Sequence, residues 1–291
     1  MRLNLLRTAL VLFILFTASS VQAESSVWVV NSSKANVYFV GSFHMLRASD
    51  YPLPAEFFTA YQDSRKIIFE VPPGEMENPE YMGKFLSAAI YDDGTTLKKH
   101  ITSAAYAKAE SFCRERNYPM EQYQFLKPTL FVITLTVLEM SRIGADPKKG
   151  IDYFFNDKAM QDGKAIGSLE TVDQQISILT SVDASVGSDQ ILEAIEELKQ
   201  IEVKLGEYLA AWRNGDEDKM EELYIKGLKR YPKLYQTLIV DRNNKWVKNI
   251  EGYLNGSGNT MVVVGAAHLV GDNSVVNLLR KRGYKVVKVQ K

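Results

Sequence analysis

Val37-Tyr38-Phe39-Val40-Gly41-Ser42-Phe43-His44 is an apolar run that stops at a glycine and reaches a histidine three residues later. Near the other end of the chain, Val262-Val263-Val264-Gly265-Ala266-Ala267-His268 repeats this pattern. Unbroken apolar runs of this kind are typical of strands that are buried on both faces. The glycine permits a tight turn, and the small residues after it allow a close approach of the backbone. Ligands of open α/β sheets bind beyond the carboxyl ends of the strands, so we expect both histidines to face such a crevice.

A third apolar run ends at an acidic residue. Lys66-Ile67-Ile68-Phe69 leads directly to Glu70, and two prolines then stop the strand. Two imidazoles and one carboxylate match the three protein ligands of a catalytic metal site, which keeps an open position for water. His44, Glu70 and His268 are therefore candidate metal ligands and catalytic residues. The alternatives are hydrogen-bonded structural histidines and a solvated or salt-bridged Glu70.

These motifs resemble the TraB/GumN family, which is similar to the Tiki metalloproteases and to the erythromycin-esterase and ChaN-like proteins. The resemblance rests on Gly41-Ser42-Phe43-His44, Ser49-Asp50-Tyr51-Pro52-Leu53-Pro54, the strand before Glu70, and Gly265 to Gly271. Further landmarks are Leu126-Lys127-Pro128, Ser168-Leu169-Glu170-Thr171, Trp212 with Gly215-Asp216, and Asp241-Arg242-Asn243 before Trp246. The resemblance covers nearly all of the chain after residue 23. It implies an α/β core and, in the Tiki branch, peptidase activity that depends on a divalent metal, with manganese or cobalt favoured and zinc possible.

Residues 1–23 are predicted to be a secretory signal peptide. Arg2 and Arg7 give a positive start, an apolar run from Ala9 to Phe16 follows, and Val21-Gln22-Ala23 has the small-residue cleavage pattern. The apolar run is too short for a secure transmembrane span, with an uncleaved anchor as the alternative. We expect cleavage near Ala23, a periplasmic or secreted protein, and no stable membrane insertion afterwards.

The remaining residues, 24–291, are expected to form one α/β domain. The full chain balances 35 basic against 35 acidic residues, and no basic stripe is present, so we expect no nucleic-acid partner. The substrate is expected to be a peptide or a small molecule. Cys113 is the single cysteine, which rules out an internal disulfide, and we expect it to be an inert packing residue.

Strands are expected at both ends of the chain, with helices between them. Val27–Val30 and the strand before Gly41 form a predicted hairpin, and Met261–Val264, Asn273–Arg282 and Lys285–Val289 form a predicted βαβ unit. Helical periodicity is found over 54–62, 80–90, 103–116, 121–142, 150–161, 189–212, 220–230 and 235–254, with a short strand over 164–169. The fold class is therefore α/β, with a mixed central sheet built from both ends of the chain. A helical insertion over about 80–161 caps the sheet, further helices occupy about 171–256, and the cap leaves an apolar groove for an extended peptide or a lipid-like substrate.

Several other polar residues are assigned roles from their positions. Glu170 follows a strand and is expected to cap the next helix. Arg242 is assigned to a catalytic oxyanion or a substrate carboxylate, with an ordinary ion pair on a helix surface as the alternative. Asn243 and Ser42 are assigned to substrate binding, and His100 is expected at the surface.

Three functions remain open. The first is an exported metal-dependent hydrolase of peptide bonds that uses the three candidate ligands to activate water. The second is a metal-free, esterase-like hydrolase with His44 as general base and Glu70 as its orienting partner. The third is a non-catalytic protein that binds a peptide, a polysaccharide precursor or a haem-like ligand. The chain has no Gly-x-Ser-x-Gly, His-Glu-x-x-His, Walker or Gly-x-Gly-x-x-Gly motif, so a serine or cysteine nucleophile has no visible motif.

Overall fold

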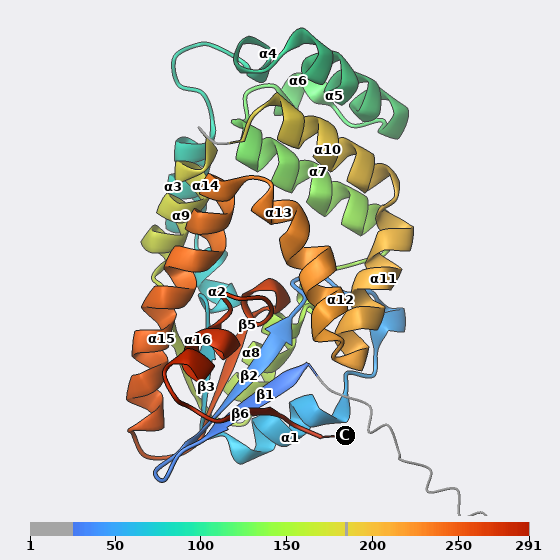
Figure 1. Ribbon diagram of the computed structural model, residues 1–291. Helices are drawn as coiled ribbons and strands as arrows, with labels where there is room; N and C mark the ends of the chain where they lie inside the picture. Colours follow the sequence, from blue (N-terminus) through green and yellow to red (C-terminus); the bar gives the residue numbers. More distant parts are fainter. Residues whose placement is uncertain (1–25, 184–185, 291) are drawn as a thin grey trace, which may run out of the picture.

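The computed structural model describes residues 26–183 and 186–290, and a six-stranded mixed sheet forms its centre (Figure 1). The strands are β1 (Val27–Asn31), β2 (Asn36–Ser42), β3 (Lys66–Phe69), β4 (Ala165–Ser168), β5 (Thr260–Gly265) and β6 (Val286–Lys288). They lie in the order β4-β3-β5-β2-β1-β6, so strands from both ends of the chain are neighbours. This confirms the predicted fold class. The predicted signal peptide lies outside the described residues.

Four adjacent strands, β4, β3, β5 and β2, run parallel to one another. β1 pairs with β2 in the predicted antiparallel hairpin, with Val27 opposite Val40. β6 is antiparallel to β1 and therefore parallel to β5. The predicted C-terminal βαβ unit thus forms, but β2 and β1 lie between its strands β5 and β6. Because the four parallel strands end at one edge of the sheet, the residues that follow them are brought together there.

Four helices flank the sheet: α1 (Ala55–Asp63), α8 (Ile151–Gln161), α15 (Asp241–Leu254) and α16 (Val275–Lys281). α1 packs on α8 through Phe57, Tyr61 and Phe155, whose rings lie 5.5 to 6.4 Å apart. α15 packs on α16 and contacts β2. The core between these layers includes three fully buried tryptophans, Trp28, Trp212 and Trp246, and this buried apolar surface is the main stabilising contribution.

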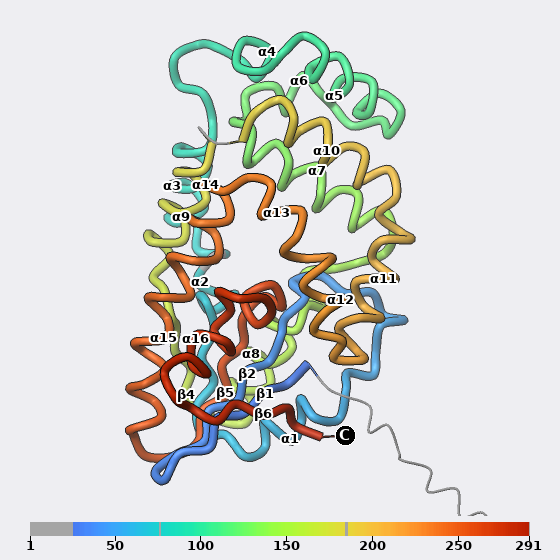
Figure 2. Tube along the Cα trace, viewed as in Figure 1, coloured from blue at the N-terminus to red at the C-terminus, as the bar shows by residue number. Residues whose placement is uncertain are grey.

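The other helices form a cap beyond the carboxyl edge of the sheet (Figure 1). They are α2 (Pro73–Met76), α3 (Pro79–Ala89), α4 (Leu97–His100), α5 (Ser103–Arg116), α6 (Met120–Tyr123), α7 (Pro128–Arg142), α9 (Val172–Ser181), α10 (Ser188–Lys199), α11 (Ile201–Asn214), α12 (Glu217–Glu221), α13 (Gly227–Lys229) and α14 (Pro232–Tyr235). α5, α7 and α10 share a second core that includes Phe112, Phe131 and Ile191. The tube in Figure 2 shows α4, α5 and α6 at the end of the cap farthest from the sheet, with α7 and α10 beneath them. No helix in the described parts is both long and apolar enough to cross a bilayer.

Two predicted helices are wrong in their extent. The helix predicted over 121–142 is divided into α6 and α7, because Pro128 holds Lys127 in an extended conformation and then begins α7. The helix predicted over 189–212 breaks at Gln200 into α10 and α11. The break lets α10 bury Ile195 in the second core while α11 buries Leu209 in the main core.

Two further helical stretches contain π-helical turns that the periodicity did not indicate. These are η4 (Glu222–Lys226) and η5 (Gln236–Val240). A π-turn inserts one residue into a helix and rotates everything after it by roughly 100°. η5 directly precedes α15, so it sets the direction in which Arg242 points.

Candidate functional site

The carboxyl ends of the parallel strands place four polar residues at one edge of the sheet. His44 follows β2, Glu70 follows β3, Glu170 follows β4 and His268 follows β5. Three of them, His44, Glu70 and His268, line a cavity of about 390 Å³ with Ser42 and Arg242. We call this cavity the strand-end crevice. The structure thus brings together five of the six predicted site residues, and Asn243 lies behind His268.

The two Gly-x-x-His motifs are held together by close backbone packing. Ser42 is the register partner of Gly265. A Cβ on Gly41 would lie 3.3 Å from the Ala266 side chain, which explains the small residues in both motifs. A Cβ on Gly265 would lie 3.4 Å from Oε1 of Glu70 and 3.7 Å from Nε2 of His44, so any larger residue there would fill the crevice.

His44 lies at the mouth of the crevice, with 67% of its side chain exposed. Its Nδ1 lies 2.8 Å from Oδ2 of Asp152, which also accepts a hydrogen bond from the Ser42 hydroxyl. The first turn of α8 approaches the His44 loop closely, since Ile151 N–H donates to the Phe43 carbonyl over 3.0 Å. The Asp152 carboxylate raises the pKa of His44 to about 9, against the opposing effect of desolvation. His44 is therefore a cation at neutral pH.

Glu70 is buried at the centre of the site. The Gly265 N–H donates to its Oε1 over 2.8 Å, and Nη2 of Arg242 donates to its Oε2. Burial by itself would raise the pKa of Glu70, but the Arg242 guanidinium, together with the charged His44 and the Gly265 N–H, holds it well below its ordinary value. The carboxylate is ionised at every pH at which the protein is expected to work.

Arg242 contacts each of the other buried ionisable groups of the site, Glu70, Glu170 and His268. Its Nε and Nη2 donate to the two oxygens of Glu170, each over 2.9 Å, in a bidentate pair. Nη2 also reaches Glu70, and Nη1 reaches the Leu238 carbonyl and Nε2 of His268 at 3.4 and 3.2 Å. All five N–H groups of the guanidinium are therefore directed at protein atoms. The pair with Glu170 is buried, so Arg242 is not part of a helix-surface ion pair.

The predicted helix-capping role of Glu170 is wrong. Thr171 caps α9, and the Gln174 side chain completes the capping box. Glu170 instead turns inward, where it receives hydrogen bonds from Arg242 and from the Trp246 indole over 3.0 Å. Arg242 is therefore a buried cation between two carboxylates, and removal of any one of the three groups would leave an uncompensated buried charge.

His268 is buried, and its ring packs on Trp246 with centroids 4.5 Å apart. Its Nδ1 lies 2.7 Å from Oδ1 of Asn243, while Nε2 faces Arg242 and lies 3.9 Å from Oε1 of Glu70. Because Nε2 faces a cation, Nδ1 carries the proton and donates to Asn243. Burial lowers the pKa of His268 to about 3. The ring is therefore neutral, and its Nε2 accepts from Nη1 of Arg242 at the wall of the crevice.

The sequence model of the TraB/PrgY/gumN family matches residues 26–288. The chain belongs to this family. Over 90% of its length it is 20% identical to a protein named Metalloprotease TIKI homolog from Nematostella vectensis, and over 90% it is 21% identical to Metalloprotease TIKI2 from Danio rerio. The chain spans 66% and 60% of these two relatives. No solved structure matches it.

The described residues of this TraB/PrgY/gumN protein contain no group of three or more His, Cys, Asp or Glu that could hold a metal ion as they stand. The 3.9 Å between His268 Nε2 and Glu70 Oε1 exceeds the roughly 3.4 Å between two ligands of a tetrahedral ion with bonds of about 2.1 Å. The guanidinium of Arg242 contacts both groups. Any ion that binds there would have to share them with this side chain.

Asp152 is the site residue of this TraB/PrgY/gumN protein that the sequence analysis missed. Its position in the first turn of a helix reads as an ordinary favourable charge at a helix start. The sequence carried one signal, the glycine at position 150. The structure gives its reason: a Cβ on Gly150 would overlap the His44 carbonyl, where α8 meets the loop after β2. His100 and Cys113 lie elsewhere, His100 exposed against the Tyr91 ring and Cys113 buried in α5.

Proposed function

We propose that this protein is an exported hydrolase that cleaves peptide bonds in the strand-end crevice, with His44, Glu70 and His268 as ligands of a divalent ion. One observation carries the proposal: histidines from opposite ends of the chain present Nε2 to the same crevice as Glu70. Each ring is held at Nδ1, one by Asp152 and the other by Asn243. Metal-binding histidines are commonly held in this way, because a hydrogen bond at Nδ1 directs Nε2 to the ion. Binding of an ion would displace the Nε2 proton of His44 and the Arg242 contact of His268.

The donor types suit such an ion, which would have to draw the three groups closer together than they lie in the structure. Zinc, manganese and cobalt all accept imidazole nitrogen together with carboxylate oxygen. The missing side chain of Gly265 leaves space beside Glu70 and His44, and His268 is already neutral. A bound divalent ion lowers the pKa of a coordinated water into the physiological range. The similarity to proteins named metalloproteases supports a divalent ion. Manganese or cobalt is the ion that the resemblance described under sequence analysis favours.

The chain's own residues prepare the site in this proposal. Arg242 and the Gly265 N–H keep Glu70 ionised and fixed in direction. Because its N–H groups are all directed at protein atoms, Arg242 acts as a positioning residue rather than as a contact to the substrate. Ser42 and Asn243 have the same role, since each holds a partner of a histidine or the histidine itself. Substrate enters on the exposed side, past His44.

The position of Arg242 favours a second candidate, a hydrolase without a metal. Its guanidinium already contacts both Glu70 and His268. His44 would then be the general base, and its orienting partner is Asp152 rather than the Glu70 expected from the sequence. A base whose pKa is about 9 is protonated at neutral pH, so the activity of this candidate should rise with pH towards about 9.

Elemental analysis of residues 24–291, purified without chelators or a His tag, tests the metal. We expect near-stoichiometric manganese, cobalt or zinc in the wild type, and its loss in the double variant His44→Ala/His268→Ala. His100→Ala is the matched control, because it removes the third histidine without touching the crevice. Equal metal in all three proteins, or none after reconstitution, contradicts the metal-dependent proposal.

A peptide library then separates the candidate functions. Hydrolysis that chelation abolishes supports the metal-dependent enzyme. Hydrolysis that survives chelation and disappears in His44→Ala supports the general base. A peptide that binds in the crevice without any turnover supports the non-catalytic binding function.

A further inference from the structure

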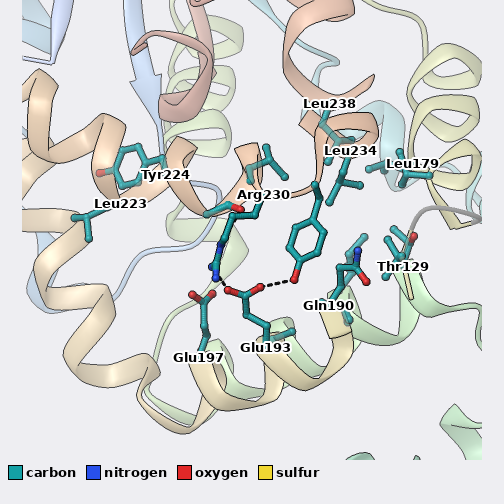
Figure 3. Close-up of a pocket in the computed structure, with 18 of the residues that line it drawn as sticks. Thr129, Leu179, Gln190, Glu193, Glu197, Leu223, Tyr224, Arg230, Leu234 and Leu238 are labelled. Carbon is teal, nitrogen blue, oxygen red and sulfur yellow. Dashed lines mark hydrogen bonds and ion pairs between the residues drawn. The ribbon is translucent and has the colours of Figure 1, made fainter. Parts of the chain in front are cut away.

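A second cavity, of about 490 Å³, lies in the cap between α7, α9, α10, α11, η4 and η5 (Figure 3). We call it the cap chamber. Its apolar wall includes Val132, Leu179, Ala194, Leu223, Leu234 and Leu238. We propose that the cap chamber binds an unbranched aliphatic chain, and that this chain is the acyl part of a substrate whose scissile carbonyl reaches the strand-end crevice. The second part rests on the proposed hydrolase function, and the first part does not.

The walls of the chamber select against a peptide backbone. Most lining residues lie inside helices, whose N–H and C=O groups are bonded within the helix. A peptide backbone entering such a cavity would leave its own N–H and C=O groups unpaired, at a cost of about 1–3 kcal/mol for each group. An aliphatic chain carries no such groups and gains from every apolar contact.

The polar side chains of the chamber wall are nearly all paired with protein atoms. Glu193 receives hydrogen bonds from Arg230 and from Tyr231, the latter over 2.6 Å (Figure 3). Glu197 receives a hydrogen bond from Lys204. Within the described residues, one buried oxygen of the wall has no partner, Oγ1 of Thr129. An occupant therefore finds few hydrogen bonds and much apolar surface, which suits an aliphatic chain.

The chamber adjoins the strand-end crevice through shared residues. Tyr208 and Tyr224 line both cavities, and their stacked rings lie 5.2 Å apart. The Tyr224 hydroxyl donates to the Tyr208 carbonyl over 2.7 Å, so the pair is fixed. The π-turns place Leu223, Tyr224 and Leu238 in the chamber wall, and π-turns of this kind are frequent at functional sites.

A second connection runs along the groove beside His44. Ile133 and Leu179 line both the cap chamber and this groove, whose other walls include His44, Glu70 and Arg242. A chain that leaves the chamber on this side therefore meets the candidate catalytic residues. This continuity is the reason for assigning the chamber to the substrate rather than to a separate ligand.

Two helical glycines provide a matched pair of variants. Gly227 lines the chamber, and a Cβ on it would lie 3.6 Å from Nη2 of Arg230, an ordinary contact. Gly206 lies exposed in α11, where a Cβ would meet nothing within 4 Å. Leucine has a higher helix propensity than glycine, so neither Gly227→Leu nor Gly206→Leu should unfold the protein. Only the first places a side chain in the chamber.

The test is calorimetric titration of the full mature chain with saturated carboxylates from butanoate to dodecanoate. Affinity should rise by roughly four-fold for each added methylene until the chamber is full. Gly227→Leu should weaken dodecanoate binding at least ten-fold, while Gly206→Leu should match the wild type. Absence of chain-length dependence, or equal binding by the two variants, overturns the inference, as does tighter binding of a leucine-rich pentapeptide to the same chamber.

The same titration on the wild type, read beside its metal content and its hydrolysis of the peptide library, separates the two proposals. Dodecanoate binding by wild-type protein that holds no metal after reconstitution and hydrolyses no peptide leaves the chamber as an aliphatic-chain site and refutes the hydrolase alone. His44→Ala should lose hydrolysis and keep dodecanoate binding, because His44 does not line the chamber. Hydrolysis without dodecanoate binding refutes the chamber alone. If both hold, a dodecanoyl-peptide should be cleaved faster than the same peptide with an acetyl group, and equal rates contradict the acyl assignment.

Discussion

Nδ1 of His44 lies 2.8 Å from the Asp152 carboxylate, which joins the loop after β2 to the first turn of α8 across 108 residues of sequence. His268 has the corresponding arrangement, with Asn243 at its Nδ1. The two partners differ in charge, and the two histidines differ accordingly. A carboxylate beside an exposed ring raises the pKa of His44, whereas burial beside a neutral amide and a guanidinium lowers that of His268.

Removing the charge of Asp152 should lower the pKa of His44. In Asp152→Asn the pKa of His44 should fall from about 9 towards 6.5, because the main cause of its increase is gone. NMR titration of the imidazole nitrogens measures this directly, since the chain has only three histidines. Asp157→Asn, an exposed change on the same helix, serves as the control. An unchanged His44 titration in Asp152→Asn would show that another group sets its pKa.

The stability of the metal-free protein should depend on the charge of His44. A pKa raised from 6.5 to about 9 means that protonation of His44 stabilises the folded state fully below pH 6.5. This contribution is lost as the pH rises through about 9. Urea unfolding of wild type and His44→Gln should therefore differ most on the acid side of this window and converge above it, with His100→Gln unaffected. A difference in unfolding free energy between wild type and His44→Gln that grows with pH would contradict a stabilising protonation of His44.

Arg242 should be essential for the fold as well as for the site. Arg242→Gln leaves the carboxylates of Glu70 and Glu170 buried without a cation, which should reduce the free energy of unfolding by about 3–5 kcal/mol. Arg282→Gln breaks a partly exposed ion pair with Glu251 and should cost less than about 1 kcal/mol. Denaturant titration compares the two variants. Similar small losses in both would mean that the buried charges are not held as the structure indicates.

The contact between the two glycine motifs should appear as an energetic coupling. Gly41→Ala brings a Cβ to 3.3 Å from the Ala266 side chain and should destabilise the protein by about 1–3 kcal/mol. The double variant Gly41→Ala/Ala266→Gly should recover part of this loss, with a coupling energy of about 0.5–3 kcal/mol. Ala267→Gly in place of Ala266→Gly should bring no recovery. Additive effects in the first pair would contradict the close packing.

The sequence alone pointed to the residues that follow buried strands. His44, Glu70 and His268 each follow an apolar run, and a run of this kind is a local signal. Because parallel strands share one carboxyl edge, a correct strand assignment was enough to place these three side chains near one another. Most helix positions followed from periodicity in the same way. Where a proline or a change of partner core interrupted the pattern, as at Pro128 and Gln200, the periodicity could not show the break.

Only the tertiary structure decided how the site is held and what lies beside it. Asp152, Glu170 and Asn243 reach their partners across 25 to 108 residues of sequence, and nothing in their local pattern names those partners. The direction of Arg242 depends on a π-turn, which a regular 3.6-residue period conceals. The cap chamber is enclosed by helices from distant parts of the chain. The sequence determined which side chains follow the strand ends, because that is a local property of the chain. Packing between distant segments determined the protonation states of these side chains, their hydrogen-bond partners and the cavity that they face.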